Sequence, residues 1–303
     1  MTGTAAALAT AILWTITAIT FEYAGKRIGA IALNFLRLAA GAVFLGIYGI
    51  VAHGSFAPFD APFSTWAWMG ASGLLGLVLG DLFLFQAFID IGARIAMLIY
   101  ALAPAFAGLL GWLVLGETLS PLALAGMALT ILGIAMAVLG RPATSGNAES
   151  PTVAAGSARR KTGRGAIFAL LATLGQAGGL ILSKIGAPKM DAFSGTQMRV
   201  LVAVLVFGII LIGSGAWKGV LSSLKDGRAA ASLLAGSFFG PFLGVSLSLA
   251  AVQGASAGVA ASIMSLVPVL IIAPSALFFK EKLRPVELIG AIVAVGGTAL
   301  LFI

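Results

Sequence analysis

Two related stretches decide how this sequence folds. Residues 93–121 read ARIAMLIYALAPAFAGLLGWLVLGETLSP, and residues 257–285 read AGVAASIMSLVPVLIIAPSALFFKEKLRP. When the sequence is shifted by 164 positions, Pro104 aligns with Pro268 and the two Glu-x-Leu-x-Pro endings coincide. Each stretch has about 20 apolar residues, which rise about 30 Å in a helix, the thickness of the hydrocarbon core of a bilayer. The sequence therefore predicts a duplicated unit containing a membrane-spanning helix that proline interrupts.

Composition extends this prediction to the whole chain. Of its 303 residues, 60% are hydrophobic and 9% are charged, whereas soluble proteins carry about 25% charged residues. The net charge of +8 comes mainly from lysines and arginines in predicted loops, where they orient a membrane protein and meet anionic lipid headgroups. We therefore expect contact with the bilayer and no nucleic-acid partner. The chain has no cysteine, and its one histidine, His53, lies in a predicted loop.

Apolar runs separated by polar or Gly- and Pro-rich breaks predict an all-α integral membrane protein with ten transmembrane helices. We place them at residues 4–21, 31–51, 66–87, 94–115, 122–139, 165–183, 194–213, 231–252, 258–279 and 286–303. Residues 140–164 are polar, rich in Gly, Ser and Pro and basic at their end, which is typical of a flexible linker. The predicted domains are a first five-helix repeat (1–139), this linker (140–164) and a second five-helix repeat (165–303).

The two repeats should be inverted relative to each other, because each has an odd number of spans. Inverted repeats are typical of secondary transporters, which bind substrate near the membrane midplane between the halves. With the N-terminus outside, most lysines and arginines fall in inner loops, and the outer loops hold only Lys184 and Lys189. By the positive-inside rule, we predict a multi-pass protein of the cytoplasmic membrane with both termini outside and the linker 140–164 in the cytoplasm.

The aligned prolines are hinge candidates. Pro104 and Pro268 lack an N–H, which leaves the carbonyls of Tyr100 and Met264 without a helical partner. Unpaired backbone in lipid costs several kcal/mol, so these carbonyls should face the protein interior or a wet cavity. The alternative is a passive kink packed against a neighbouring helix.

Two charged residues inside the predicted spans are candidates for a gate or for coupling. Arg37 and Asp81 each lie about 9 Å from the predicted cytoplasmic end of their span, and a charge at such depth must be paired or face water. We predict a contact between them, either as a structural pair or as a gate or proton-linked switch on the cytoplasmic side. Arg199 holds the place of Arg37 in the second half, whereas Val245 matches Asp81.

Polar and aromatic residues on spans one, three and four, and on their counterparts six, eight and nine, are the candidates for a substrate cavity. These are Trp14, Gln86, Tyr100, Gln176, Ser183, Ser246, Gln253 and Ser262. Neutral hydrogen-bonding groups with aromatic rings suit a small zwitterionic or polar solute better than a large anion, because no cluster of basic residues is expected at the midplane. For any single member of the set, interhelical packing is the alternative.

No catalytic motif accompanies these candidates. The sequence contains no Walker phosphate loop, no H-E-x-x-H, no G-x-S-x-G and no potassium-channel filter. We therefore assign no catalytic residue, metal ligand or cofactor, and we do not expect an enzyme. A lipid-processing membrane enzyme is the alternative from another class, but it would need a clustered nucleophile and base. A structural membrane scaffold is a third possibility.

The ordered set of features, seen twice, resembles the EamA branch of the drug/metabolite transporter superfamily. Each half has five spans with a proline in the fourth, then GETLSP or KEKLRP, where Lys280 replaces glycine, and then a Gly-containing fifth span. The resemblance covers nearly the whole chain except the linker, and the plan is similar to that of bacterial aromatic amino-acid exporters. The resemblance implies a ten-helix bundle around a central cavity, with export of amino acids or related metabolites. We expect a monomer that transports its substrate by alternating access. A sugar, nucleotide-sugar or drug carrier is the alternative.

Overall fold

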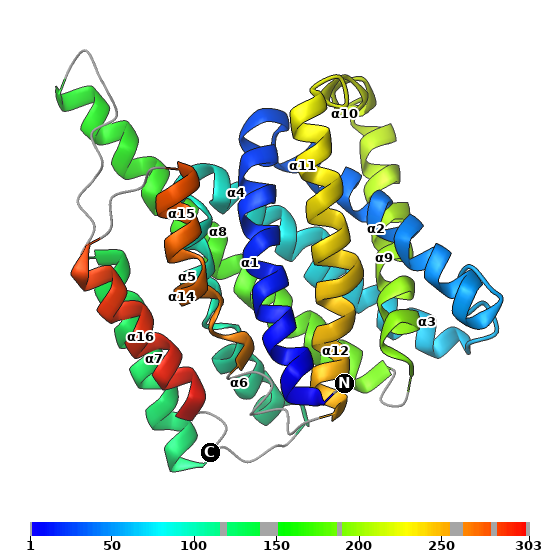
Figure 1. Ribbon diagram of the computed structural model, residues 1–303, viewed down its shortest axis with the longest axis horizontal. Helices are drawn as coiled ribbons and strands as arrows, with labels where there is room; N and C mark the ends of the chain where they lie inside the picture. The colour runs from blue at the N-terminus through cyan, green and yellow to red at the C-terminus, as the bar shows by residue number, and fades with distance from the viewer. Residues whose placement is uncertain are drawn as a thin grey trace.

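The computed structural model of the protein describes residues 2–115, 120–139, 151–186, 190–254, 263–279 and 284–300. All regular secondary structure in these residues is helical (Figure 1). In chain order the helices are α1 (Gly3–Ile28), α2 (Ala30–His53), α3 (Phe63–Gly73), η1 (Leu74–Gly80), α4 (Asp81–Ile91), α5 (Ala93–Tyr100), α6 (Ala103–Leu115), α7 (Pro121–Leu139), α8 (Pro151–Gly186), α9 (Ala192–Gly213), α10 (Trp217–Ser223), α11 (Gly227–Ser237), η2 (Phe238–Gly244), α12 (Val245–Gly254), α14 (Val267–Leu270), α15 (Ile272–Phe279) and α16 (Pro285–Leu300).

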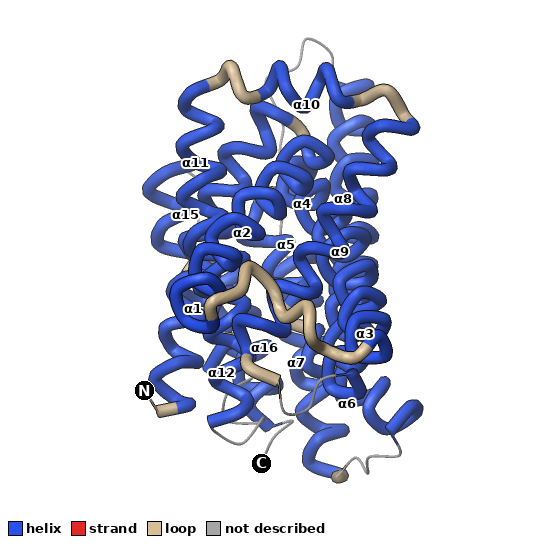
Figure 2. The backbone as a smooth tube through the Cα atoms, turned by 90° about the vertical axis from the view of Figure 1, so that its right-hand side faces the viewer, coloured by secondary structure: helices blue, strands red, loops and turns tan. Residues whose placement is uncertain are grey.

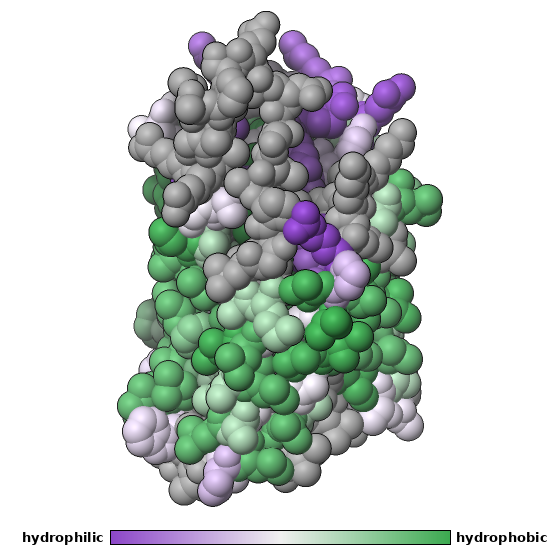
Figure 3. Space-filling model, turned by 90° about the vertical axis from the view of Figure 1, so that its left-hand side faces the viewer, coloured by the Kyte–Doolittle hydropathy of each residue, from purple (hydrophilic) through white to green (hydrophobic). Residues whose placement is uncertain are grey.

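The helices have the length and composition of membrane spans. Seven segments of the described chain are long and apolar enough to cross a bilayer: Gly3–Ile28, Ala30–His53, Phe63–Ile91, Ala93–Val114, Lys161–Ser183, Ala192–Gly213 and Gly227–Ala251. Two shorter apolar helices, Leu124–Met136 and Pro285–Leu300, accompany them. On the face seen in Figure 3, apolar side chains cover the middle of the molecule and hydrophilic ones gather toward one end. The all-helical, multi-pass membrane fold is confirmed, while the number of ten spans stays a prediction.

The predicted linker is partly helical. Residues 140–150 lie outside the described residues, but residues 151–164 form the first turns of α8, which runs without a break into the sixth predicted span. Two local features explain this. Pro151 is favoured at the first position of a helix, and the Ala, Arg and Lys residues of this stretch have high helix propensity.

Glycines make the tightest connections between consecutive spans. Gly29 (φ 81°) is the single residue between α1 and α2, and Gly92 (φ 83°) is the single residue between α4 and α5. A side chain would be strained at such positive φ angles, so glycine is required at both turns. The elements on either side are therefore held close together at one end of the bundle.

Ion pairs at that end show that the two halves run in opposite directions. Arg27, near the end of α1, binds Asp226 just before α11 at 2.6 Å, and Arg164 of α8 binds Asp90 near the end of α4 at 2.7 Å. The ends of the first and third spans thus meet the starts of the sixth and eighth. The start of α1 and the end of α16 lie together at the opposite end of the molecule (Figures 1 and 2). The described spans that these pairs join therefore run in opposite directions in the two halves.

α7 packs against α16, which is its counterpart in the second half. A Cβ added at Gly133 on α7 would lie 2.7 Å from the carbonyl oxygen of Gly290, and one at Gly297 on α16 would lie 2.8 Å from that of Gly126. The shift of 164 positions exchanges these two contacts (126 + 164 = 290; 133 + 164 = 297). The α7–α16 contact is thus self-complementary, and its glycines let the two backbones approach closely.

A π-helix interrupts the third span of each half at the same place. η1 and η2 each cover seven residues, and both of their boundaries differ by 164 positions. π-helical turns leave backbone groups out of the regular helical ladder and occur frequently at functional sites. We did not predict them, because no residue pattern distinguishes them from an α-helix.

Candidate functional site

A small cavity of about 80 Å³ lies between the two halves. Its walls come from α1, α2, η1, α4 and α5 of the first half and from α8, α9, η2 and α12 of the second. Of the residues predicted from the sequence, five line it: Trp14, Arg37, Asp81, Tyr100 and Gln176.

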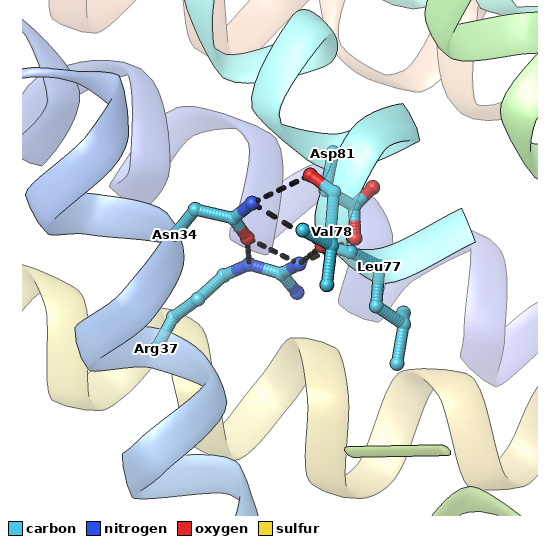
Figure 4. A network of polar contacts seen from close by, with 5 residues as sticks. All are labelled: Asn34, Arg37, Leu77, Val78 and Asp81. Carbon is cyan, nitrogen blue, oxygen red and sulfur yellow. Dashed lines mark hydrogen bonds and ion pairs between the residues drawn. The ribbon is translucent and has the colours of Figure 1, made fainter. Parts of the chain in front are cut away.

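The predicted contact between Arg37 and Asp81 is present. The Nη2 of Arg37 forms an ion pair with Oδ2 of Asp81, and both side chains are largely buried (Figure 4). The helical segment of Asp81 continues to Ile91, ten residues or about 15 Å further (91 − 81 = 10), so it is longer than the predicted span. The position of the pair toward the cytoplasmic side stays a prediction.

Asn34 completes this network, and sequence reasoning missed it. Its Oδ1 accepts hydrogen bonds from Nε and Nη2 of Arg37 at 2.9 and 2.8 Å, while its Nδ2 donates to the carbonyls of Leu77 and Val78 (Figure 4). These carbonyls belong to η1, whose π geometry turns backbone oxygens away from the usual helical partners. The spacing of three residues between Asn34 and Arg37 places both on one helix face, a signal that could have identified the partner.

Aromatic rings enclose the Arg37 guanidinium. Its Cζ lies 4.8 Å from the ring centroid of Phe85 and 5.9 Å from that of Phe21, and the two rings meet edge to face at 5.2 Å. Such rings attract a cation through their negative faces. Arg37 is thus held by a carboxylate, an amide, a carbonyl and two rings, so its position is fixed.

Arg199 lines the same cavity from the second half without such support. It is 7% exposed, and its buried Nε has no hydrogen-bond partner. Within the described part of the chain, Arg199 forms no ion pair or side-chain hydrogen bond. Its Nη2 lies 3.2 Å from the point a Cβ would occupy on Gly76, and Oε1 of Gln176 lies 3.3 Å from that point. Glycine at position 76 therefore leaves the space into which the guanidinium extends.

The expectation that no basic residues cluster at the midplane was wrong. Arg37 is seven residues from the start of α2 (37 − 30 = 7), and Arg199 is seven from the start of α9 (199 − 192 = 7), or about 10 Å in each helix. The two helices enter from opposite sides, and both arginines reach one cavity. The sequence repeat aligned Arg199 with Arg37. It did not show that the two arginines lie at similar depths from opposite surfaces and so reach the same cavity.

Two predicted cavity residues serve contacts elsewhere. Nε2 of Gln86 donates to Oδ1 of Asp90 within α4 at 3.1 Å. The hydroxyl of Ser183 lies 2.7 Å from that of Ser72 and donates to the carbonyl of Gly179 at 3.0 Å, where α8 packs on α3. The Ser183 hydroxyl therefore lies at a contact between helices, whereas Gln86 bonds within its own helix.

The other candidates fall outside the cavity or outside the described residues. Ser246 is fully buried on α12, where its Oγ has no hydrogen-bond partner. The backbone of Gln253 lies in α12, but its side chain is not described, and Ser262 lies outside the described residues. Their part in a cavity stays a prediction.

Both predicted prolines mark a break in a span. α5 ends at Tyr100 and α6 begins at Ala103, one residue before Pro104; Pro268 is likewise the second residue of α14. Proline fits the first turn of a helix, where its missing N–H has no partner to lose. Each proline therefore begins a new helix rather than kinking a continuous one.

Comparisons with known proteins bear on both halves of this arrangement. A model of the EamA-like transporter family matches residues 1–139 and 163–303. No curated protein matches the chain. A solved structure described as "Crystal structure of protein" is 19% identical, with a TM-score of 0.60 over 98% of this chain and 95% of that chain. At this identity the likeness shows a shared fold.

Proposed function

The chain belongs to the EamA-like transporter family, and from this premise we propose that it exports amino acids or related small metabolites across the cytoplasmic membrane by alternating access. Membership makes it a multi-pass membrane transporter of small molecules. The observation that carries the finer proposal is the charged cavity between the inverted halves, because buried charges inside a membrane mark substrate or ion pathways.

The symmetry of the halves supports alternating access. In an inverted repeat, the two access states can arise when each half adopts the conformation of the other around a fixed site. Asp81 pairs with Arg37 of the first half and lines the same cavity as Arg199 of the second. We propose that Asp81 acts as the gate by changing partner between these arginines, and that the breaks at Pro104 and Pro268 are the hinges.

Efflux from proteoliposomes tests this function. Purified protein is reconstituted into vesicles loaded with a mixed pool of amino acids, sugars and cationic dyes, and the released compounds are identified by mass spectrometry. We expect amino acids or related metabolites to leave faster than from protein-free vesicles. Release of sugars or dyes instead would favour the alternative carriers, and release equal to that of empty vesicles would contradict transport.

An Asp81→Asn variant tests the gate. It keeps the size of the side chain but removes the charge for which the two arginines compete. Efflux should fall several-fold, whereas Lys225→Gln, which removes an exposed charge on the α10–α11 connection, should transport like the wild type. Equal efflux by the Asp81→Asn variant and the wild type would remove Asp81 from the gate.

A further inference from the structure

The charges at the central cavity do not balance. Arg37, Arg199 and Asp81 line it, and Asp81 is the one acidic residue among the described lining residues. Asp81 is paired with Arg37. One positive charge therefore remains, and it belongs to Arg199.

An unpaired arginine at this depth is costly. Removing a guanidinium from water without hydrogen-bond partners costs several kcal/mol. At Arg37 the ion pair, the hydrogen bonds and the aromatic rings described above offset this cost. Among the described residues, no ion pair or hydrogen bond holds the Arg199 side chain in this way, although the residue is only 7% exposed. Arg199 lines the cavity, and its Nη2 lies beside Gln176 and the cleared space over Gly76.

The chemistry of the free group selects its ligand. A guanidinium presents a planar fork of N–H donors that matches the two oxygens of a carboxylate. An amine or another cation would instead meet a net positive site whose single carboxylate is already engaged, so like charges would repel it.

The rest of the wall is apolar. Trp14, Phe21, Phe85, Phe88 and Met97 line the cavity next to the charged groups. A ligand that fits both parts has an anionic head and an apolar body.

We propose that the cavity binds organic carboxylates with an apolar body, and that Arg199 is the residue that binds the carboxylate. This inference rests on the proposed transport function, whose substrate class it narrows: recognition depends on the carboxylate and does not need an amino group. An amino acid is then bound through its acid end, and the acid that lacks the amino group is bound as well.

The test compares compounds that share one apolar body and differ in the head. We compare each of three acids, propionate, 4-methylpentanoate and 3-phenylpropionate, with its matching amide and amine. Sodium chloride at equal ionic strength is the control for an inorganic anion. Binding to the full chain in detergent is read from the rise in unfolding temperature and from calorimetry, because a ligand that binds the folded state stabilises it. We expect at least one acid to stabilise the protein while its amide, its amine and chloride do not.

Two variants assign the effect to Arg199. Arg199→Gln should weaken binding of the acid about tenfold or more, and Arg199→Lys should retain part of it because the charge remains without the planar fork. Since the arginine has no partner to lose, Arg199→Gln should unfold at or above the wild-type temperature without ligand. That second readout separates loss of binding from loss of folding, and Lys225→Gln is the control for lost charge alone.

Each outcome decides the proposal. It is overturned if amides or amines bind as tightly as acids, if chloride stabilises as much as every acid, or if Arg199→Gln binds the acid as the wild type does. Efflux assays keep the two proposals apart. Acids that bind but are not released would contradict export and leave the carboxylate site standing, whereas export of amides as fast as acids would contradict the site and leave export standing.

Discussion

Arg37 and Arg199 enter one cavity from opposite halves of the protein, yet only Arg37 has an ion-pair partner within the described residues. The partner, Asp81, follows η1 directly, and the matching position after η2 is Val245. The duplicated scaffold therefore places two arginines symmetrically, while a single carboxylate makes the site asymmetric.

This asymmetry predicts opposite effects of the same substitution. Arg37→Gln should lower the free energy of unfolding by about 3–5 kcal/mol, because it leaves the buried carboxylate of Asp81 without its cation. Arg199→Gln should cause no loss. Unfolding by SDS in mixed micelles, without ligand, measures both, and equal destabilisation by the two variants would contradict the unequal roles.

The α7–α16 contact predicts a difference between adjacent glycines. Gly297→Val should destabilise the protein by about 1–3 kcal/mol, because its side chain would meet the backbone of Gly126 across the contact. Gly296→Val should be nearly neutral, since nothing lies within 4 Å of the Cβ position there. The same unfolding assay applies. If Gly296→Val is as harmful as Gly297→Val, helix propensity rather than the close approach is responsible.

The Arg27–Asp226 pair predicts a stability difference that disappears in acid. The hydrogen bond from Arg27 lowers the pKa of Asp226 below its ordinary value of 3.8. A depressed carboxylate pKa adds stability above the unfolded value, and the added stability is lost as the pH falls through the lower folded value. Asp226→Asn keeps a group that can cap α11 but removes the charge.

We therefore expect the wild type to unfold at a higher temperature than Asp226→Asn near pH 7. The two should converge below about pH 4, which is close to the ordinary pKa of aspartate. Thermal unfolding between pH 3 and pH 7 checks this. A difference independent of pH would mean that the charge is not its cause.

The predicted orientation can be tested by single cysteines, since the chain has none. Lys225 lies at the end of the molecule that carries the Arg27–Asp226 pair, and Asp60 lies in the connection between α2 and α3 at the other end. The two variants are Lys225→Cys and Asp60→Cys. A membrane-impermeant maleimide added to intact cells should label position 60 and not position 225. The reverse pattern would place the termini in the cytoplasm.

The hinge proposal predicts a loss of transport without a loss of insertion. Pro268→Ala and the double variant with Pro104→Ala should slow efflux several-fold, because a helix that continues through the break removes the flexible point. Pro121→Ala, at the exposed first residue of α7, is the matched control. Wild-type efflux by the double variant would show that the prolines are not needed as hinges.

The sequence predicted the features that repeat in a pattern. The shared prolines, the two related halves and the need to pair Asp81 all follow from spacing and from the cost of charge in lipid. The roles of Gln86 and Ser183 did not follow, because depth along a helix does not tell which neighbour its face meets. Arg199 was related to Arg37 but not placed at the site, since that requires knowing that α9 enters from the opposite surface.

The winding of η1 has a consequence for Asp81, which directly follows it. The backbone N–H of Asp81 bonds to the carbonyl of Gly76, five residues earlier. If η1 tightened to ordinary α-helical winding, each residue of register change would turn the carboxylate by about 100° around the helix axis. The same rewinding of η2 would turn Val245, which carries no charge. Rewinding of η1 would therefore change the electric field in the cavity, because it moves the charge of Asp81. Rewinding of η2 would leave that field unchanged, because it moves the uncharged Val245.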